Sequence, residues 1–138
     1  MKKIINKIKE LPFGSAGSAA PSLHIISMQQ DLKFNNLPTM PTEFTELLHH
    51  TNTINYDGVF IFGINPNSYF LDILSENLRL ELPNSENILI LGGDDFEYLA
   101  YNPKDDCYQI IDKDDMKVLE TYSRLPEALS YILKIDDE

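Results

Sequence analysis

The sequence predicts a single α+β domain with a mainly antiparallel central sheet and helices packed against it. Three observations predict it: apolar residues at helical spacing before residue 50, short apolar strands separated by turn residues between 88 and 121, and helical spacing again near the C-terminus. Helices on either side of a meander are typical of α+β proteins. The length of 138 residues and the 43% hydrophobic content fit one domain with one core, spanning residues 1–138.

The N-terminal residues predict a short amphipathic helix. Ile4, Ile5, Ile8 and Leu11 recur at helical spacing, and lysines occupy the other faces. We expect this isoleucine stripe to dock on the core; binding to a membrane surface is the alternative, which so few apolar residues support weakly. Residues 12–21, rich in Gly, Ser, Ala and Pro, predict a flexible connection too short to separate two domains.

A second helix is predicted over residues 22–34. Its apolar positions are Leu23, Ile26 and Met28, and turn residues at 35–38 end it. We expect these three side chains to face the core.

A third helix is predicted to begin near Pro41, which suits the first helical turn. Glu43 favours the positive end of the helix dipole. Phe44, Leu47 and Leu48 follow at i, i+3 and i+4 spacing, so they predict a buried face that packs against the strand at 59–62.

The pattern then changes from helical to strand spacing. Residues 59–62 are β-branched or aromatic and end at Gly63. A break is predicted at 66–67, a short helix or helical turn within 71–78, and a loop at 82–85.

The remaining residues predict a meander closed by a helix. Strands are expected at 88–91, 96–101 and 107–111, with a short edge strand at 117–121, and turns are expected at 92–95, 102–106 and 112–115. Ser123 is predicted to cap the last helix, which is buried through four apolar residues: Leu125, Leu129, Ile132 and Leu133.

Acidic residues outnumber basic ones by 22 to 11, which gives a net charge of -11. The first ten residues carry four lysines and one glutamate, whereas residues 94–138 carry five basic and thirteen acidic side chains. Such a field repels phosphates and speeds encounters with cationic surfaces, so we expect a basic protein partner rather than direct binding to nucleic acid. Solubility alone is the simpler explanation of the charge.

The chain is expected to be cytoplasmic and to have no membrane span. Cys107 is the single cysteine, so no internal disulfide can form, and the first residues show no apolar core with a small-residue cleavage site. No apolar run approaches the ~20 residues that cross a bilayer.

The predicted turns of the meander hold seven aspartates: Asp94, Asp95, Asp105, Asp106, Asp112, Asp114 and Asp115. In a meander the first and third turns lie at one end of the sheet and the second at the other. We therefore expect Asp94, Asp95, Asp112, Asp114 and Asp115 to form one patch, which is the predicted partner-binding site. Simple solvation of the turns is the alternative explanation of these carboxylates.

No catalytic or metal-binding pattern is evident, so the chain is not predicted to be an enzyme and no cofactor is expected. The segment 112–115 lacks the glycine and the distal glutamate of an EF-hand loop. The three histidines show no zinc-site spacing with Cys107, which is expected to be a structural thiol. Gly92-Gly93 precedes two aspartates, which repel phosphate rather than cradle it.

Four segments form an ordered set along the chain: PTEFTELL at 41–48, GVFIFG at 58–63, DILSEN at 72–77 and ILILGGD at 88–94. This set resembles the signature segments of the SUKH superfamily, which groups fungal cell-wall-synthesis regulators of the Smi/Knr type with bacterial immunity proteins. The closing helix at 123–133 is similar to that of the family. The resemblance covers most of the chain and implies a single SUKH-like domain that binds another protein.

The resemblance and the acidic residues after position 94 together predict an immunity protein that binds and neutralises a toxin domain through an acidic surface. If the toxin is a nuclease, carboxylates would occupy its phosphate sites by charge complementarity. The alternatives are an intracellular regulatory scaffold like the fungal members and a small-molecule-binding domain, which a well-formed apolar pocket with convergent polar groups would favour.

Overall fold

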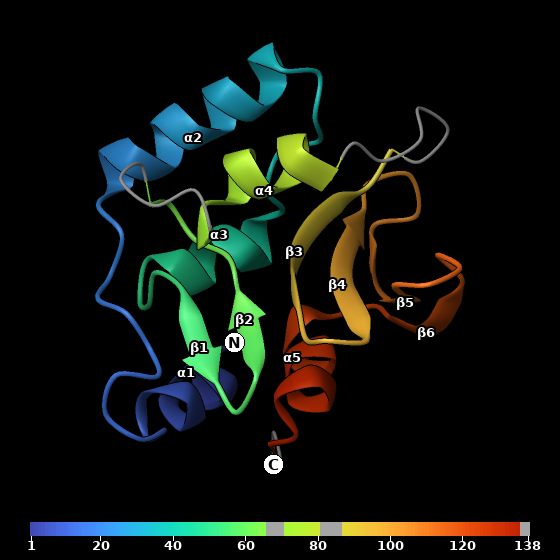
Figure 1. Ribbon diagram of the computed structural model, residues 1–138. Coiled ribbons are helices and arrows are strands. Elements are labelled where there is room, and N and C mark those ends of the chain that lie inside the picture. The colour runs from blue at the N-terminus through green and yellow to red at the C-terminus, as the bar shows by residue number, and fades with distance from the viewer. Residues whose placement is uncertain (66–70, 81–86, 136–138) are drawn as a thin grey trace.

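The predicted α+β class is confirmed by the computed structural model, which describes residues 1–65, 71–80 and 87–135 (Figure 1). From one edge of its antiparallel sheet to the other, the strands follow chain order: β1 Ile54–Tyr56, β2 Val59–Ile61, β3 Leu89–Gly93, β4 Glu97–Asn102, β5 Cys107–Asp112 and β6 Val118–Tyr122. The helices are α1 Lys2–Lys9, α2 Ser22–Phe34, α3 Thr42–Leu48, α4 Ile73–Leu80 and α5 Leu125–Leu133.

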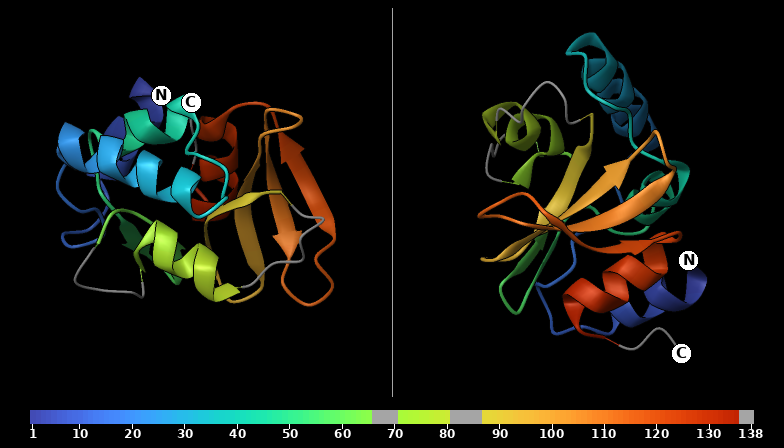
Figure 2. Two further views of the ribbon diagram at one scale, coloured as in Figure 1. Left: turned by 90° about the horizontal axis from the view of Figure 1, so that it is seen from above. Right: turned by 90° about the vertical axis from the view of Figure 1, so that its right-hand side faces the viewer.

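The helices form two groups around the sheet. Helix α5 packs on β5 and β6 with α1 beside it, whereas α4 packs on β3 with α2 beside it. The right-hand view of Figure 2 shows α1 and α5 on one side of the twisted sheet and α2 and α4 on the other. Helix α4 meets β3 at Ile90, and α5 reaches β4 through a hydrogen bond from the Tyr131 hydroxyl to Glu97, so the two helices approach β3 and β4 from opposite sides of the sheet.

Three of the predicted helical faces are buried as expected, and one of them is the face of α5 made by Leu125, Leu129, Ile132 and Leu133. The isoleucine stripe of α1 lies in the core, as does the α3 face made by Phe44, Leu47 and Leu48. These side chains and Phe62 belong to one continuous core. Burial of these apolar side chains supplies most of the driving force that holds the helices on the sheet.

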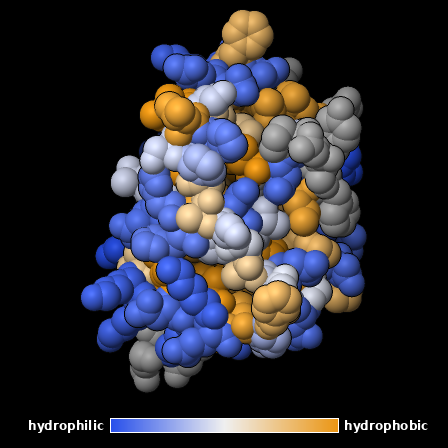
Figure 3. Space-filling model, turned by 90° about the vertical axis from the view of Figure 1, so that its left-hand side faces the viewer, coloured by the Kyte–Doolittle hydropathy of each residue, from blue (hydrophilic) through white to orange (hydrophobic). Residues whose placement is uncertain are grey.

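Helix α2 covers the predicted residues but buries a different stripe. Leu23 and Ile26 are 77% and 54% exposed, and the buried side chains are Ile25, Met28 and Leu32. The helix carries apolar residues on both faces, so spacing alone did not decide which face meets the core. Apolar side chains are scattered among hydrophilic ones on this side of the molecule (Figure 3).

Strand β1 was not predicted. It pairs with β2 through a two-residue hairpin in which Asp57 and Gly58 both have positive φ, 50° and 81°. That is the backbone geometry for which Asp-Gly is favoured, because its twist matches that of the strands. Only Ile54 of β1 is buried, so a strand of three residues left too few apolar positions for an alternating pattern.

The connection at 12–21 lies beside β1 and is hydrogen-bonded to it and to neighbouring residues. The Gly17 amide donates to the Thr53 carbonyl at 2.9 Å, and the Asn52 amide donates to the Ser18 carbonyl at 2.7 Å. A side chain at position 17 would run into the Asn52 carbonyl, so the close approach of the two segments requires glycine there.

Strand β3 extends through both glycines that were predicted to lie in a turn. Gly92 pairs with Ile61, and a side chain on Gly92 would run into the Phe60 carbonyl. Gly92 therefore permits close approach of β2, and Gly93, where a side chain would run into the Glu97 carbonyl, permits close approach of β4. Phe96, predicted to begin a strand, lies in the turn before β4. The predicted break at 66–67 and loop at 82–85 lie outside the described residues.

Asn77 takes the place of a neighbouring strand where β2 has ended. Its side-chain amide donates to the Ile90 carbonyl at 2.9 Å and accepts from the Ile90 amide at 2.8 Å, while also donating to the Ile73 carbonyl at 2.8 Å. Buried backbone groups need such partners. Two further side-chain amides bond both backbone groups of a distant residue in the same way, Gln29 with Met40 and Asn52 with Ile64.

The start of α5 corrects the prediction that Ser123 caps it. Arg124 is the N-cap residue and makes no side-chain cap bond. Instead, Glu43 of α3 accepts the Leu125 amide at 3.1 Å, and its other oxygen accepts Arg124 Nε at 2.7 Å. A carboxylate from a distant helix thus satisfies a free N–H group at the positive end of α5.

We expect Glu43→Ala to lower the free energy of unfolding by about 1–2 kcal/mol, as loss of a helix cap does. Glu43→Gln should have a smaller effect, because its side-chain oxygen can still accept the Leu125 amide. Chemical denaturation measures both. Glu46→Ala, an exposed change on the same helix, is the control, and equal effects at positions 43 and 46 would refute this role of Glu43.

Candidate functional site

The meander brings two acidic turns together at one end of the sheet. Glu97 pairs with Asp112 in the β4–β5 register, and the Lys113 amide donates to the Phe96 carbonyl at 3.0 Å. The turn that holds Asp94 therefore lies against the turn that follows Asp112, as the strand order predicted. Asn102 pairs with Cys107 at the other end of these strands, so the turn with Asp105 and Asp106 points away.

Three of the five predicted site residues hold their own turns. Asp94 Oδ1 accepts the amides of Phe96 and Glu97 at 2.9 and 2.8 Å. Asp112 Oδ1 accepts the Asp114 amide at 2.7 Å, and Asp115 Oδ1 accepts the Lys117 amide at 3.0 Å. Aspartate is favoured in turns for this reason. These carboxylates thus have a structural use, and their charge remains on the surface as well.

Asp95 and Asp114 differ from the other three site residues. Both are exposed, and the structure records no hydrogen bond to either carboxylate from a described residue. They are therefore free to meet a partner without loss of a turn contact. Their position in the turn distinguishes them from Asp94 and Asp112. An aspartate at the first position of a turn accepts the amides two and three residues later, whereas Asp95 and Asp114 lie at later positions.

An exposed aromatic ring lies within this acidic end. Phe96 is 77% exposed and sits between Asp95 and Glu97. Its carbonyl is held by the Lys113 amide, so the backbone under the ring is fixed. Rigid aromatic side chains with a charged rim are typical of protein-binding hot spots. The alternating pattern at 96–101 predicted that Phe96 begins a strand, so its exposed position in the turn was not expected.

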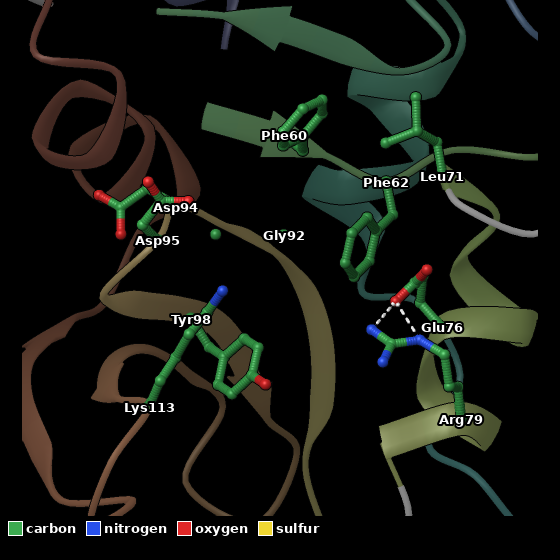
Figure 4. A pocket seen from close by; sticks show the side chains of 11 residues that line it. Phe60, Phe62, Leu71, Glu76, Arg79, Gly92, Asp94, Asp95, Tyr98 and Lys113 are labelled. Carbon is green, nitrogen blue, oxygen red and sulfur yellow. Dashed lines mark hydrogen bonds and ion pairs between the residues drawn. The ribbon is translucent and has the colours of Figure 1, made fainter. Parts of the chain in front are cut away.

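A hollow of about 240 Å³ adjoins the acidic turns on the face that α5 does not cover (Figure 4). Its lining comes from β2, β3, β4, α4 and the two turns: Phe60, Phe62, Leu71, Glu76, Arg79, Gly92, Gly93, Asp94, Asp95, Tyr98 and Lys113. Of the predicted site residues, this hollow includes Asp94 and Asp95. The others in it were missed, because apolar residues on both faces of β2 gave no sign of which face stays open.

Two ion contacts with defined geometry lie in the hollow. Glu76 is buried, and its carboxylate accepts a hydrogen bond from Arg79 Nη2 at 2.6 Å. This hydrogen bond and the charge of Glu76 raise the pKa of Arg79 above its ordinary value. On the other side, Lys113 Nζ lies 4.8 Å from the centre of the Tyr98 ring, within range of a cation–π contact.

The turn with Asp105 and Asp106, at the other end of the sheet, is flanked by a tyrosine and a cysteine whose pKa values are raised. The Tyr101 hydroxyl donates to Asp106 at 2.9 Å, and burial together with this bond raises the pKa of Tyr101 to about 12. Burial, with the charges of Asp105 and Asp106, also raises the pKa of the Cys107 thiol. An activated cysteine needs the opposite shift, so at neutral pH this side chain stays a thiol.

Within residues 1–65, 71–80 and 87–135, no three His, Cys, Asp or Glu side chains are grouped so that they could hold a metal ion. None of the helices described there is long and apolar enough to cross a membrane. Comparison with protein-family profiles finds no match to the chain, and no curated protein matches it.

Proposed function

We propose that this chain is a non-catalytic protein-binding domain of the immunity type, which neutralises a toxin domain by covering a basic surface on it in the cytoplasm. The observation that carries the proposal is the acidic end of the sheet, where two turns with five aspartates lie side by side around an exposed phenylalanine. The ordered segments that resemble the SUKH superfamily support the immunity role.

Charge and shape at this end fit a basic protein better than other partners. Carboxylates there would meet lysines or arginines, such as those that line the phosphate sites of a nuclease, and Phe96 would supply an apolar anchor. The neighbouring hollow is open and about 240 Å³, below the ~300–1,000 Å³ of most small-molecule pockets. At this end of the sheet, a macromolecular partner is therefore favoured over a metabolite.

A capture experiment tests the proposal. The tagged chain, incubated with lysate of its source organism, should retain a basic protein domain that elutes as salt is raised. Expression of that domain alone should be toxic, and co-expression of this chain should relieve the toxicity.

The control is a pair of charge-matched double variants. Asp95→Asn with Asp114→Asn should reduce capture, whereas Asp105→Asn with Asp106→Asn, at the other end of the sheet, should not. Retention of a metabolite in place of a protein, or equal capture by both variants, would contradict the proposed function.

A further inference from the structure

We propose that the partner adds one extended strand of its own to the free edge of the sheet at β6, with a lysine or arginine of that strand beside Glu120. The inference rests on the proposed function for the existence of a protein partner. It adds the segment of backbone by which this chain holds that partner.

The two edge strands of the sheet differ in what covers them. Along β1 the chain's own connection occupies the edge: Ala16 forms a bridge with Ile54, and the Asn55 amide donates to the Ser15 carbonyl at 2.7 Å. Beyond β6 the described residues place no further strand, and four of its five residues are exposed (Figure 2). Unpaired backbone groups at a sheet edge are a template for a strand of another chain.

The register shows which backbone groups of β6 point outward. The Asp112 amide donates to the Lys117 carbonyl at 2.8 Å, so the even-numbered residues of β5 bond β6 and the odd-numbered ones bond β4. Thr121 lies opposite Gln109, an odd-numbered residue, and therefore directs its own N–H and C=O away from the sheet. The β-bulge lies earlier in β6, so the ladder over residues 120–122 is regular.

One face of this edge is both acidic and aromatic. The Tyr122 ring lies 6.0 Å from the Tyr131 ring of α5, so Tyr122 faces α5, as does Glu120 two residues earlier. Burial and the charges of three carboxylates raise the pKa of Tyr122: Glu120, Glu127 and Glu97. A cationic side chain is favoured on this face, because it meets negative charge and can also contact the rings.

The ladder geometry places a partner residue directly against Glu120. In antiparallel pairing, a residue opposite Thr121 exchanges two backbone bonds with it, and its neighbours lie opposite Glu120 and Tyr122 at the shorter Cα distance of ~4.5 Å. Opposite charges at such positions stabilise the pair, whereas like charges destabilise it. A second copy of this chain fits less well, because it would bring another glutamate-bearing β6 and a net charge of -11 to the same edge.

Titration of the ¹⁵N-labelled full chain with the peptide acetyl-Val-Lys-Thr-Lys-Val-amide tests this edge without the partner. When the central threonine pairs with Thr121, the two lysines lie opposite Glu120 and Tyr122. We expect saturable shifts of the backbone amide signals of these three residues at low salt. Two control peptides should leave the signals in place: one with glutamates for lysines, and one whose central threonine amide is N-methylated and cannot donate.

Two pairs of variants separate this edge from the general acidic field. Thr121→Pro removes the outward N–H and should weaken peptide binding by about two- to ten-fold, whereas Thr121→Ala keeps it and should not. Glu120→Gln should weaken binding by up to about five-fold, and Asp57→Asn, which removes a charge at the opposite edge, should change it less. Unchanged dispersion of the other amide signals verifies that each variant is folded. In the capture experiment, Thr121→Pro should reduce retention of the partner more than Thr121→Ala does.

Equal binding of the peptide and its N-methylated form, or equal effects of the two changes at Thr121, would overturn the inference. So would dimers of the unmodified chain that Thr121→Pro dissociates, as measured by light scattering, because the edge would then belong to a second copy. Each of these results leaves capture of a basic partner by the acidic turns intact. Conversely, if no protein is captured but the peptide binds as described, the proposed function fails while the strand site stands.

Discussion

Asn77→Ala should lower the free energy of unfolding by about 3–5 kcal/mol. The substitution leaves the amide and carbonyl of Ile90 and the carbonyl of Ile73 without their side-chain partner, and Asn77 is only 5% exposed. Each buried backbone group left without a partner costs about 1–3 kcal/mol. Denaturant unfolding followed by circular dichroism measures the change, with an unchanged slope indicating the same folded state.

Two comparisons make this prediction specific to the backbone contacts. Gln29 bonds Met40 in the same way but is partly exposed, so Gln29→Ala should cost less, since water can replace its side chain. Asn55 is exposed, so Asn55→Ala should cost least. If Asn77→Ala costs no more than Asn55→Ala, the side chain of Asn77 does not stabilise the edge of β3.

Replacement of Asp94, Asp95, Asp114 and Asp115 by Asn should slow association with the captured partner at low salt by about ten-fold or more. Steering by opposite charges raises association rates by that order, and its loss should also flatten the dependence of the rate on salt. Asparagine keeps an oxygen that can accept the turn amides, so the fold should be retained. Stopped-flow or surface-based kinetics at several salt concentrations measure the effect.

The rate of dissociation and a second variant complete this test. Neutralised steering charges should change dissociation much less than association, whereas Phe96→Ala should mainly speed dissociation because it removes an apolar anchor. If association rates and salt slopes match those of the unmodified chain, the aspartates serve only to solvate and hold their turns.

Part of the candidate site could be predicted from the sequence and part could not. Strand order placed Asp94 beside the turn after Asp112, because in a meander alternate turns share an end of the sheet. The sequence did not predict the hollow. The hollow depends on Phe60 and Tyr98, which lie on strands that both pair with β3. It also depends on Glu76 of α4, a helix that lies between β2 and β3 in the chain.

The sequence by itself determined the α+β class, the helices, most of the strands and the location of the acidic turns. Each of these follows from short-range spacing or from turn chemistry within a few residues. Only the tertiary structure decided which face of α2 is buried. It also decided that Glu43 rather than Ser123 accepts an amide at the start of α5, and that Asn77 bonds the backbone of Ile90 where β3 has no neighbouring strand. Those choices join residues far apart in the chain, and the free energy that selects them comes from burial and from backbone groups that must find partners once the elements pack.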